Sequence, residues 1–262
     1  MIKPKKSMGQ NFLTSVGALN AIVEAADIKK GEVILEAGPG KGVLTKELLK
    51  KGAQVIAVEK DDRLAEYIKE IFDPEMKDGK LVLVHADILD FEIKLIMHGI
   101  THWKLISNIP YYITGQFLRK FLSARAQPER MVLILQKEVV ERILAKDGKE
   151  SILSLSVKAY GKPRFVQTIK AGSFTPMPKV DSAIVSIENI SKEFFKGFTE
   201  DGFFSLVRAG FASKRKKLTS NLSGEFPKEK VLLAFEELGL DPNTRAEDVK
   251  LETWQKLSEK IL

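Results

Sequence analysis

Short strand-like runs alternate with helix-like segments between Glu32 and about Ala145, and this rhythm limits the fold more than any other feature. The strand-like runs are rich in β-branched residues, as is typical of strands buried on both faces of a parallel sheet. They cover residues 33–37, 55–58, 81–84, 105–106 and 131–135. Apolar residues at three- and four-residue spacing predict amphipathic helices over 44–50, 63–72 and 116–122. The pattern predicts an α/β fold with a mostly parallel sheet.

The rhythm changes in the second half of the chain. After helix-like segments at 139–144 and 152–160, extended runs at 165–169 and 183–187 flank the turn-rich FTPMPKVDS. We interpret these runs as a strand pair added antiparallel at one edge, which gives a seven-stranded sheet. From about Ser191 the signals are helical, at 203–212, 228–238 and 251–261. We therefore expect a main domain over 1–190 and a small all-helical domain over 191–262.

Composition narrows the functional classes. Lys and Arg number 42 against 35 Asp and Glu, and the net charge of +7 favours nucleic acid or another anionic partner. The chain has no cysteine and three scattered histidines, so we expect no metal site and no thiol chemistry. Its apolar runs fall far short of the roughly 20 residues of a membrane span, and the N-terminus lacks a secretory signal. We expect a cytoplasmic protein with no membrane partner.

The segment VILEAGPGKGVLTKELL places Gly38, Gly40 and Gly42 between a buried strand and a helix. Such a position suits tight turns and close approach of the backbone to a ligand. A dinucleotide fingerprint needs its third glycine where Val43 stands, and no GK[ST] ending is present. A glycine loop preceded by the acid Glu36 fits S-adenosylmethionine enzymes better.

Two further acids follow the next strands. Glu59 ends the second strand and can accept the ribose hydroxyls, while Asp87 ends the third and can accept from an adenine amine. Each acid alone is more often a solvated charge. Together with the glycine loop they fall where ligands of open α/β sheets bind, so we expect a cofactor site that includes the neighbours Lys60 and Ile88.

The fourth strand leads into ISNIPYYITG. The side-chain oxygen of Asn108 and the carbonyl of Ile109 can accept both hydrogens of an adenine N6 amine, and Pro110 fixes the backbone that carries them. Tyr111 offers a ring face for a base that has left its helix. Phe174 is the candidate for a second stacking ring, with a core phenylalanine as the equally favoured alternative.

These motifs resemble the rRNA adenine N6,N6-dimethyltransferases, most closely the bacterial KsgA type. The likeness covers nearly the whole chain and includes GQNFL, EAGPGKGVLT, NIPYYIT, FTPMPKVDSA, FASKRKKLTSNL and DPNTRAEDV. It implies a class I S-adenosylmethionine-dependent methyltransferase fold, Rossmann-like, followed by a helical domain. It also implies that GQNFL folds over the cofactor and brings Gln10, Asn11 and Leu13 into the site.

The implied substrate is 16S rRNA within the 30S ribosomal subunit or its precursor. Four cofactor molecules would dimethylate two adjacent adenosines in a 3′-terminal hairpin loop, and we expect the enzyme to be a monomer. One position departs from the family, which usually has Asn or His where this chain has Tyr112. A basic cluster on the helical domain is expected to contact RNA phosphates: Arg208, Lys214, Arg215, Lys216 and Lys217.

Two rival functions stay open at this point. Methyltransferases that dimethylate a large-subunit rRNA adenine share the glycine loop and the NIPY core, although the tail motifs favour the small-subunit enzymes. A catalytically silent ribosome-assembly or transcription factor on the same fold is the other rival. The presence of Asn108, Glu59 and Asp87 argues against loss of catalysis.

Overall fold

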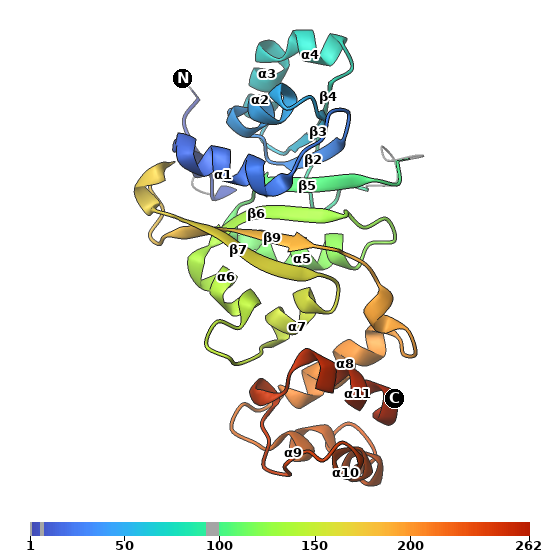
Figure 1. Ribbon diagram of the computed structural model, residues 1–262. Helices are drawn as coiled ribbons and strands as arrows, with labels where there is room; N and C mark the ends of the chain where they lie inside the picture. The colour runs from blue at the N-terminus through green and yellow to red at the C-terminus, as the bar shows by residue number, and fades with distance from the viewer. Residues whose placement is uncertain (1, 6–7, 93–99) are drawn as a thin grey trace. The chain divides into compact units, whose positions relative to one another are not determined.

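The computed structural model describes residues 2–5, 8–92 and 100–262. The chain forms two compact units, one of residues 1–140 with 162–190 and the other of residues 141–161 with 191–262 (Figure 1). This division differs from the expected boundary, because residues 141–161 group with the C-terminal helices rather than with the sheet.

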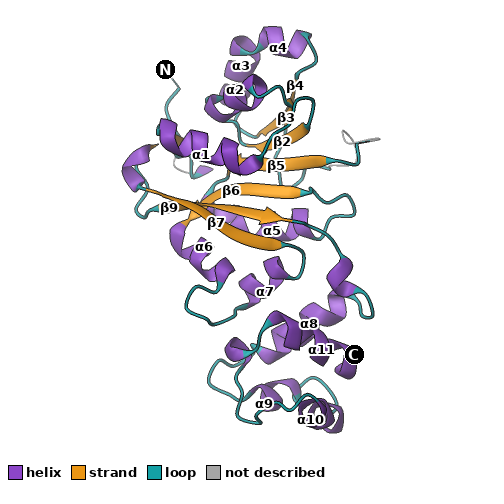
Figure 2. Cartoon of the chain, viewed as in Figure 1, coloured by secondary structure: helices purple, strands orange, loops and turns teal. Residues whose placement is uncertain are grey.

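The first unit is built on a seven-stranded sheet in the order β4-β3-β2-β5-β6-β9-β7 (Figure 2). Its strands are β2 (Val33–Ala37), β3 (Gln54–Glu59), β4 (Leu81–His85), β5 (Trp103–Asn108), β6 (Arg130–Gln136), β7 (Lys162–Ile169) and β9 (Ser182–Glu188). The first five pair in parallel, and β9 pairs antiparallel with both β6 and β7. The predicted mostly parallel sheet with an antiparallel addition at one edge is confirmed.

The central strands are buried on both faces, as their composition predicts. Ile34 of β2 and Ile106 of β5 belong to the core cluster shared with α1, while their neighbours Leu35 and Leu105 are also fully buried. Because successive side chains of a strand point to opposite faces, the sheet has an apolar layer on each side. The helices of this unit are α1 (Val16–Ala26), α2 (Val43–Lys50), α3 (Asp62–Ile71), α4 (Asp73–Lys77) and α5 (Thr114–Leu122).

A two-stranded sheet of β1 (Phe12–Leu13) and β8 (Phe174–Thr175) joins the N-terminal segment to the loop before β9. In its antiparallel register Leu13 faces Phe174 and Phe12 faces Thr175. Thr14 extends the connection, because its backbone N–H and its hydroxyl both donate to the carbonyl of Ser173. The residues just before α1 are thereby fixed to a part of the chain about 160 residues away.

The second unit is helical. Its helices are α7 (Ile152–Lys158), α8 (Glu200–Gly210), α9 (Leu218–Leu222), α10 (Lys228–Glu237) and α11 (Leu251–Ile261), and α6 (Lys137–Leu144) spans the boundary between the units. This unit also has the short 3-10 helices η5 (Glu193–Phe195) and η6 (Ala246–Asp248), while η3 (Tyr111–Ile113) and η4 (Ala171–Ser173) belong to the first unit.

Contacts within the second unit explain why residues 141–161 belong to it. The ring of Tyr160 lies 5.0 Å from that of Phe195 and 6.0 Å from that of Phe204. The backbone N–H of Glu150 donates to the carbonyl of Glu247 at 2.7 Å. Among the described residues, no helix has both the length and the apolar character that a membrane crossing requires.

Candidate active site

A pocket opens at the carboxyl ends of β2, β3, β4 and β5, which are neighbours in the sheet. This is the edge where open α/β sheets bind their ligands. The residues expected at the cofactor all line it: Gln10, Asn11, Leu13, Glu36, Gly38, Gly40, Glu59, Lys60, Asp87, Ile88 and Asn108. Ile109, Pro110 and Tyr111 line the same pocket, so segments from five parts of the chain meet there.

The glycine loop forms one wall of the pocket. Gly38 adopts φ of +67°, and a Cβ added to it would meet no protein atom within 4 Å, so it would project into open space. Gly40 adopts φ of +60°, and a Cβ there would lie 3.1 Å from the ring of Phe12. Left-handed backbone of this kind favours glycine. The loop therefore leaves room for a ligand at Gly38 while Phe12 packs closely on Gly40.

Glu36 is buried beneath this loop. Its side chain is 1% exposed, and its Oε2 accepts a hydrogen bond from the hydroxyl of Thr45 at 2.7 Å. Burial is the main reason that the pKa of Glu36 is raised to about 8, with the hydrogen bond from Thr45 opposing the shift and the nearby Glu59 adding to it. In the free protein this carboxyl is largely protonated at neutral pH.

Glu59 is held by backbone donors. Its Oε1 accepts from the N–H groups of Lys60 and Asp61 at 2.9 Å each, and its Oε2 accepts from Gly40 at 3.2 Å. Burial raises the pKa of Glu59 in spite of these donors. The contact with Gly40 ties the acid at the end of β3 to the glycine loop that follows β2.

Asp87 pairs with Lys60. The Lys60 ammonium lies 2.6 Å from Oδ2 of Asp87, and the N–H of Leu89 donates to Oδ1 at 2.9 Å. Burial alone would raise the pKa of Asp87, but the Lys60 ammonium and the Leu89 N–H outweigh it and lower the pKa. Lys60 thus reaches the pocket as the partner of Asp87, and the sequence did not reveal this pairing.

Asn108 ends β5 with its amide already oriented. Its Nδ2 donates to the backbone carbonyl of Asn11 at 3.1 Å. The side-chain amide of Asn11 donates in turn to the carbonyl of Gly9 at 3.2 Å. Because the NH₂ group of Asn108 is committed to Asn11, the amide presents its oxygen as an acceptor.

The two tyrosines of the motif occupy different environments. Tyr111 is partly buried, and its hydroxyl lies 2.6 Å from Oγ of the fully buried Ser182. Tyr112 is 66% exposed, and its ring lies beside Gly9, where an added Cβ would be 3.3 Å away. The hydroxyl contact fixes the ring of Tyr111 at the pocket, whereas Tyr112 stands at the rim.

Phe174, the candidate for a second stacking ring, is buried and is not among the residues that line the pocket. Its side chain is 3% exposed and belongs to the hydrophobic core of the first unit. Its place in β8, opposite Leu13, accounts for this burial. The alternative interpretation, a core phenylalanine beside a proline turn, describes Phe174 in this structure.

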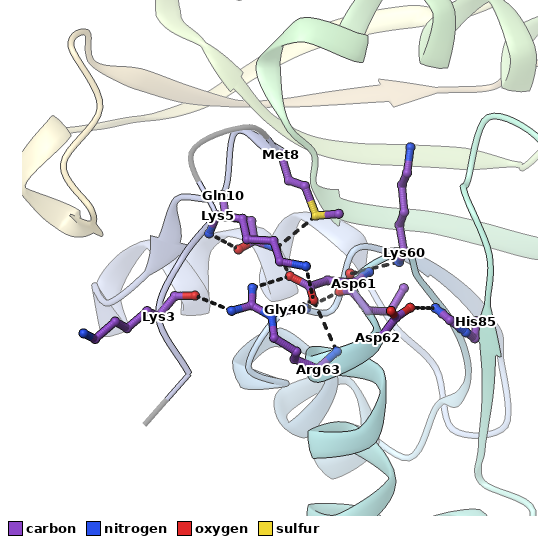
Figure 3. A network of polar contacts seen from close by, with 11 residues as sticks. Lys3, Lys5, Met8, Gln10, Gly40, Lys60, Asp61, Asp62, Arg63 and His85 are labelled. Atoms are coloured by element: carbon purple, nitrogen blue, oxygen red, sulfur yellow. Dashed lines mark hydrogen bonds and ion pairs between the residues drawn. The ribbon is translucent and has the colours of Figure 1, made fainter.

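The segment before α1 folds over the pocket, and we call residues 2–5 and 8–13 the N-terminal strap. Met8 and the residues up to Leu13 line the pocket. The strap is bound to Asp61 and Arg63 at the start of α3 (Figure 3). Asp61 was absent from the residues expected at the site, although an Asp that follows a strand and begins a helix is a recognisable N-cap.

The basic cluster lies in the second unit. Arg208 is exposed on α8, and residues 214–217 are exposed in the turn between α8 and α9 rather than on a helix. Among the described residues none of these five cations pairs with an acidic side chain. Cations without acidic partners are available to an anionic ligand.

Comparison with known proteins agrees with this geometry. The Ribosomal RNA small subunit methyltransferase A of Dehalococcoides mccartyi is 44% identical over 260 residues, which are 98% of this chain and 88% of that protein. The crystal structure of a dimethyladenosine transferase from Plasmodium falciparum has a TM-score of 0.79 at 29% identity, over 94% of this chain and 95% of that one. The 23S rRNA methyltransferase ErmE has a TM-score of 0.77 at 26% identity, over 96% and 99%. The family profile described as Ribosomal RNA adenine dimethylase matches residues 1–262, and the chain therefore belongs to that family.

Proposed function

We propose that this enzyme transfers methyl groups from S-adenosyl-L-methionine to N6 of two adjacent adenosines in the 3′-terminal hairpin loop of 16S rRNA, dimethylating each. One observation carries the proposal: Asn108 has its NH₂ group bound to Asn11 and presents an acceptor oxygen beside the pocket. The choice of RNA is supported by relatives that carry the name of a small-subunit methyltransferase.

The pocket residues fit S-adenosylmethionine. The open space beside Gly38 suits close approach of a ligand to the backbone. Glu36, Glu59 and Asp87 give the pocket three carboxyl groups, which favours a ligand with a cationic sulfonium and an ammonium group. Ile88 and Leu13 add apolar surface that suits an adenine ring. When bound, the cofactor supplies an activated methyl group.

Residues of the NIPYY motif would prepare the adenine amine. Its lone pair is delocalised into the ring, so N6 is a poor nucleophile on its own. The oxygen of Asn108 and the carbonyl of Ile109 would accept the two N6 hydrogens and favour a pyramidal amine. The amide of Asn108 is too weak a base to accept a proton at neutral pH. Asn108 therefore orients the amine, and the proton that N6 loses on methylation passes to solvent.

Tyr111 would stack on the target base. The contact between its hydroxyl and Ser182 supports this role, because a ring held at both ends needs no further ordering when the base arrives. Such a base must leave its helix or come from a loop, and a hairpin loop supplies one.

The proposal also covers how the enzyme binds the RNA and the ribosomal particle that contains it. The cations at 208 and 214–217 would bind RNA phosphates within the 30S subunit or its precursor. We also propose that the enzyme is a monomer and that it acts in the cytoplasm. Size-exclusion chromatography with light scattering tests the monomer, and a stable dimer would contradict it.

The central experiment supplies labelled S-adenosylmethionine to the enzyme with separated small and large ribosomal subunits that lack the modification. We expect N6,N6-dimethyladenosine in small-subunit RNA. The likeness to ErmE makes methylation of a large-subunit adenine the second candidate, and label confined to large-subunit RNA would establish it. Absence of label from both would indicate an assembly factor instead.

A further inference from the structure

A buried carboxylate outside the expected site connects the N-terminal strap to α3. The side chain of Asp61 is fully buried, and its oxygens accept five hydrogen bonds (Figure 3). Two come from the strap, from Nε2 of Gln10 at 3.0 Å and from Nζ of Lys5 at 3.2 Å. The others come from Arg63, through its backbone N–H at 3.2 Å and through its guanidinium at 3.0 and 2.6 Å.

Arg63 neutralises Asp61 without help from the strap. Its guanidinium contacts both carboxylate oxygens in the bidentate manner that binds carboxylates strongly. Lifting the strap would therefore break the contacts of Gln10 and Lys5 but leave no unpaired buried charge. The part of the strap before β1 is thus held by bonds that can open and close again without disturbing the ion pair of Asp61 and Arg63.

The turn that carries Asp61 also holds Glu59, one of the acids expected at the cofactor. The backbone N–H of Asp61 donates to Oε1 of Glu59 at 2.9 Å. Gln10 uses both ends of its amide within the protein, because its Oε1 accepts from the N–H of Lys5 at 2.7 Å while its Nε2 reaches Asp61. The amide of Gln10 therefore folds the strap, and the strap residues from Met8 to Leu13 form a wall of the pocket.

We propose that Asp61 is a positioning residue that latches the N-terminal strap over the pocket, through Gln10 and Lys5, and thereby slows release of S-adenosylmethionine. The inference depends on the pocket binding this cofactor and is independent of which RNA is methylated. If the wild-type protein failed to bind the cofactor, the assignment of the pocket would fail. If it bound normally and the latch variants matched it, the latch alone would fail.

Two lysines of the strap provide a matched pair. Lys5→Ala removes a contact to Asp61, whereas Lys3→Ala removes an equal charge from an exposed side chain and leaves the carbonyl that Arg63 contacts. The dissociation rate of labelled S-adenosylmethionine is measured by chase with unlabelled cofactor. We expect Lys5→Ala to accelerate dissociation about tenfold, the effect of losing one charge-assisted hydrogen bond, and Lys3→Ala to leave it unchanged. Equal rates for the two variants would overturn the proposal.

Near-isosteric changes on both sides of the contact test the hydrogen bond between Gln10 and Asp61. Gln10→Glu places a second carboxylate against Asp61, and we expect dissociation to accelerate by more than about tenfold through repulsion. In the double variant Gln10→Glu/Asp61→Asn one amide again faces one carboxylate, so the rate should return toward that of the wild type. Failure of this rescue, with both variants folded by circular dichroism, would contradict the latch.

Hydrogen exchange gives a readout that requires no cofactor. In the free protein, a peptide covering residues 8–13 should exchange faster in Gln10→Glu than in the wild type, while peptides from β3 and β6 remain unchanged. Equal exchange of the strap in the two proteins would show that Asp61 does not hold it.

Discussion

Glu36 offers a direct test of how the pocket receives a cationic ligand. With its pKa near 8, about 10% of this carboxyl is ionised at pH 7 and about 1% at pH 6. A sulfonium and an ammonium group in the pocket would favour the ionised form. Cofactor binding should therefore release a proton from Glu36, and affinity should rise about 90-fold between pH 6 and pH 9.

The measurement is calorimetric titration with S-adenosylmethionine at several pH values, in buffers of different ionisation enthalpy. Glu36→Gln removes this titrating group, so its affinity should change with pH only through groups that both proteins share, namely the ligand's own amine and Glu59, whose pKa burial also raises. These contributions are common to both proteins and cancel in the ratio of their affinities. Glu66→Gln, which alters an exposed Glu that pairs with Lys69 on α3, should behave as the wild type. The same pH dependence in the wild type and Glu36→Gln would refute the linkage.

The free protein supplies a second readout with a defined sign. Because the folded-state pKa of Glu36 is raised, its contribution to stability is complete below the unfolded value near 4.5 and is lost as pH rises through about 8. The loss is at most on the order of 5 kcal/mol, from about 1.4 kcal/mol for each pH unit between the two values. Urea unfolding should show this decline in the wild type and not in Glu36→Gln.

Three further changes probe the site, the RNA surface and the helical unit. Asn108→Ala should abolish methyl transfer in single-turnover assays while cofactor affinity stays within several-fold, and unchanged turnover would disprove the orienting role. Neutralising residues 214–217 should weaken RNA binding and flatten its salt dependence by up to about 3 logarithmic units per decade of salt, with cofactor affinity as the control. Trp254→Ala removes a fully buried side chain of α11 and should lower the free energy of unfolding by about 3–5 kcal/mol in urea titrations.

The local sequence pattern was enough to predict the strands of the sheet but not every helix of the same unit. The run at 131–135 became β6 with one more residue at each end, because a short continuous apolar run flanked by polar residues has few other structures available. The helix α1 carried a usable signal that was overlooked, since Leu19, Ile22, Val23 and Ala26 recur at helical spacing after the N-cap Ser15.

Other features depended on contacts between distant parts of the chain. The helix at 152–158 was recognisable, but the membership of this segment in the second unit rests on contacts such as those of Tyr160 with Phe195 and Phe204, which lie 35 and 44 positions later. The burial of Phe174 likewise depends on the pairing of β8 with β1, which no periodicity in FTPMP could indicate. Residue type and spacing state what a side chain can do, and only tertiary contacts decide what it faces.

The N-terminal strap shows why this matters for catalysis. Its Asn11 carbonyl accepts a hydrogen bond from Nδ2 of Asn108, while its Gln10 amide donates to Asp61 at the start of α3. A strap that lifted from Asp61 would carry Asn11 with it and free the Asn108 amide to rotate. The acceptor oxygen is therefore fixed only when the wall over the cofactor is in place. Cofactor retention and orientation of the amine acceptor are thus consequences of the same closed segment, and a variant that loosens the first should also impair the second.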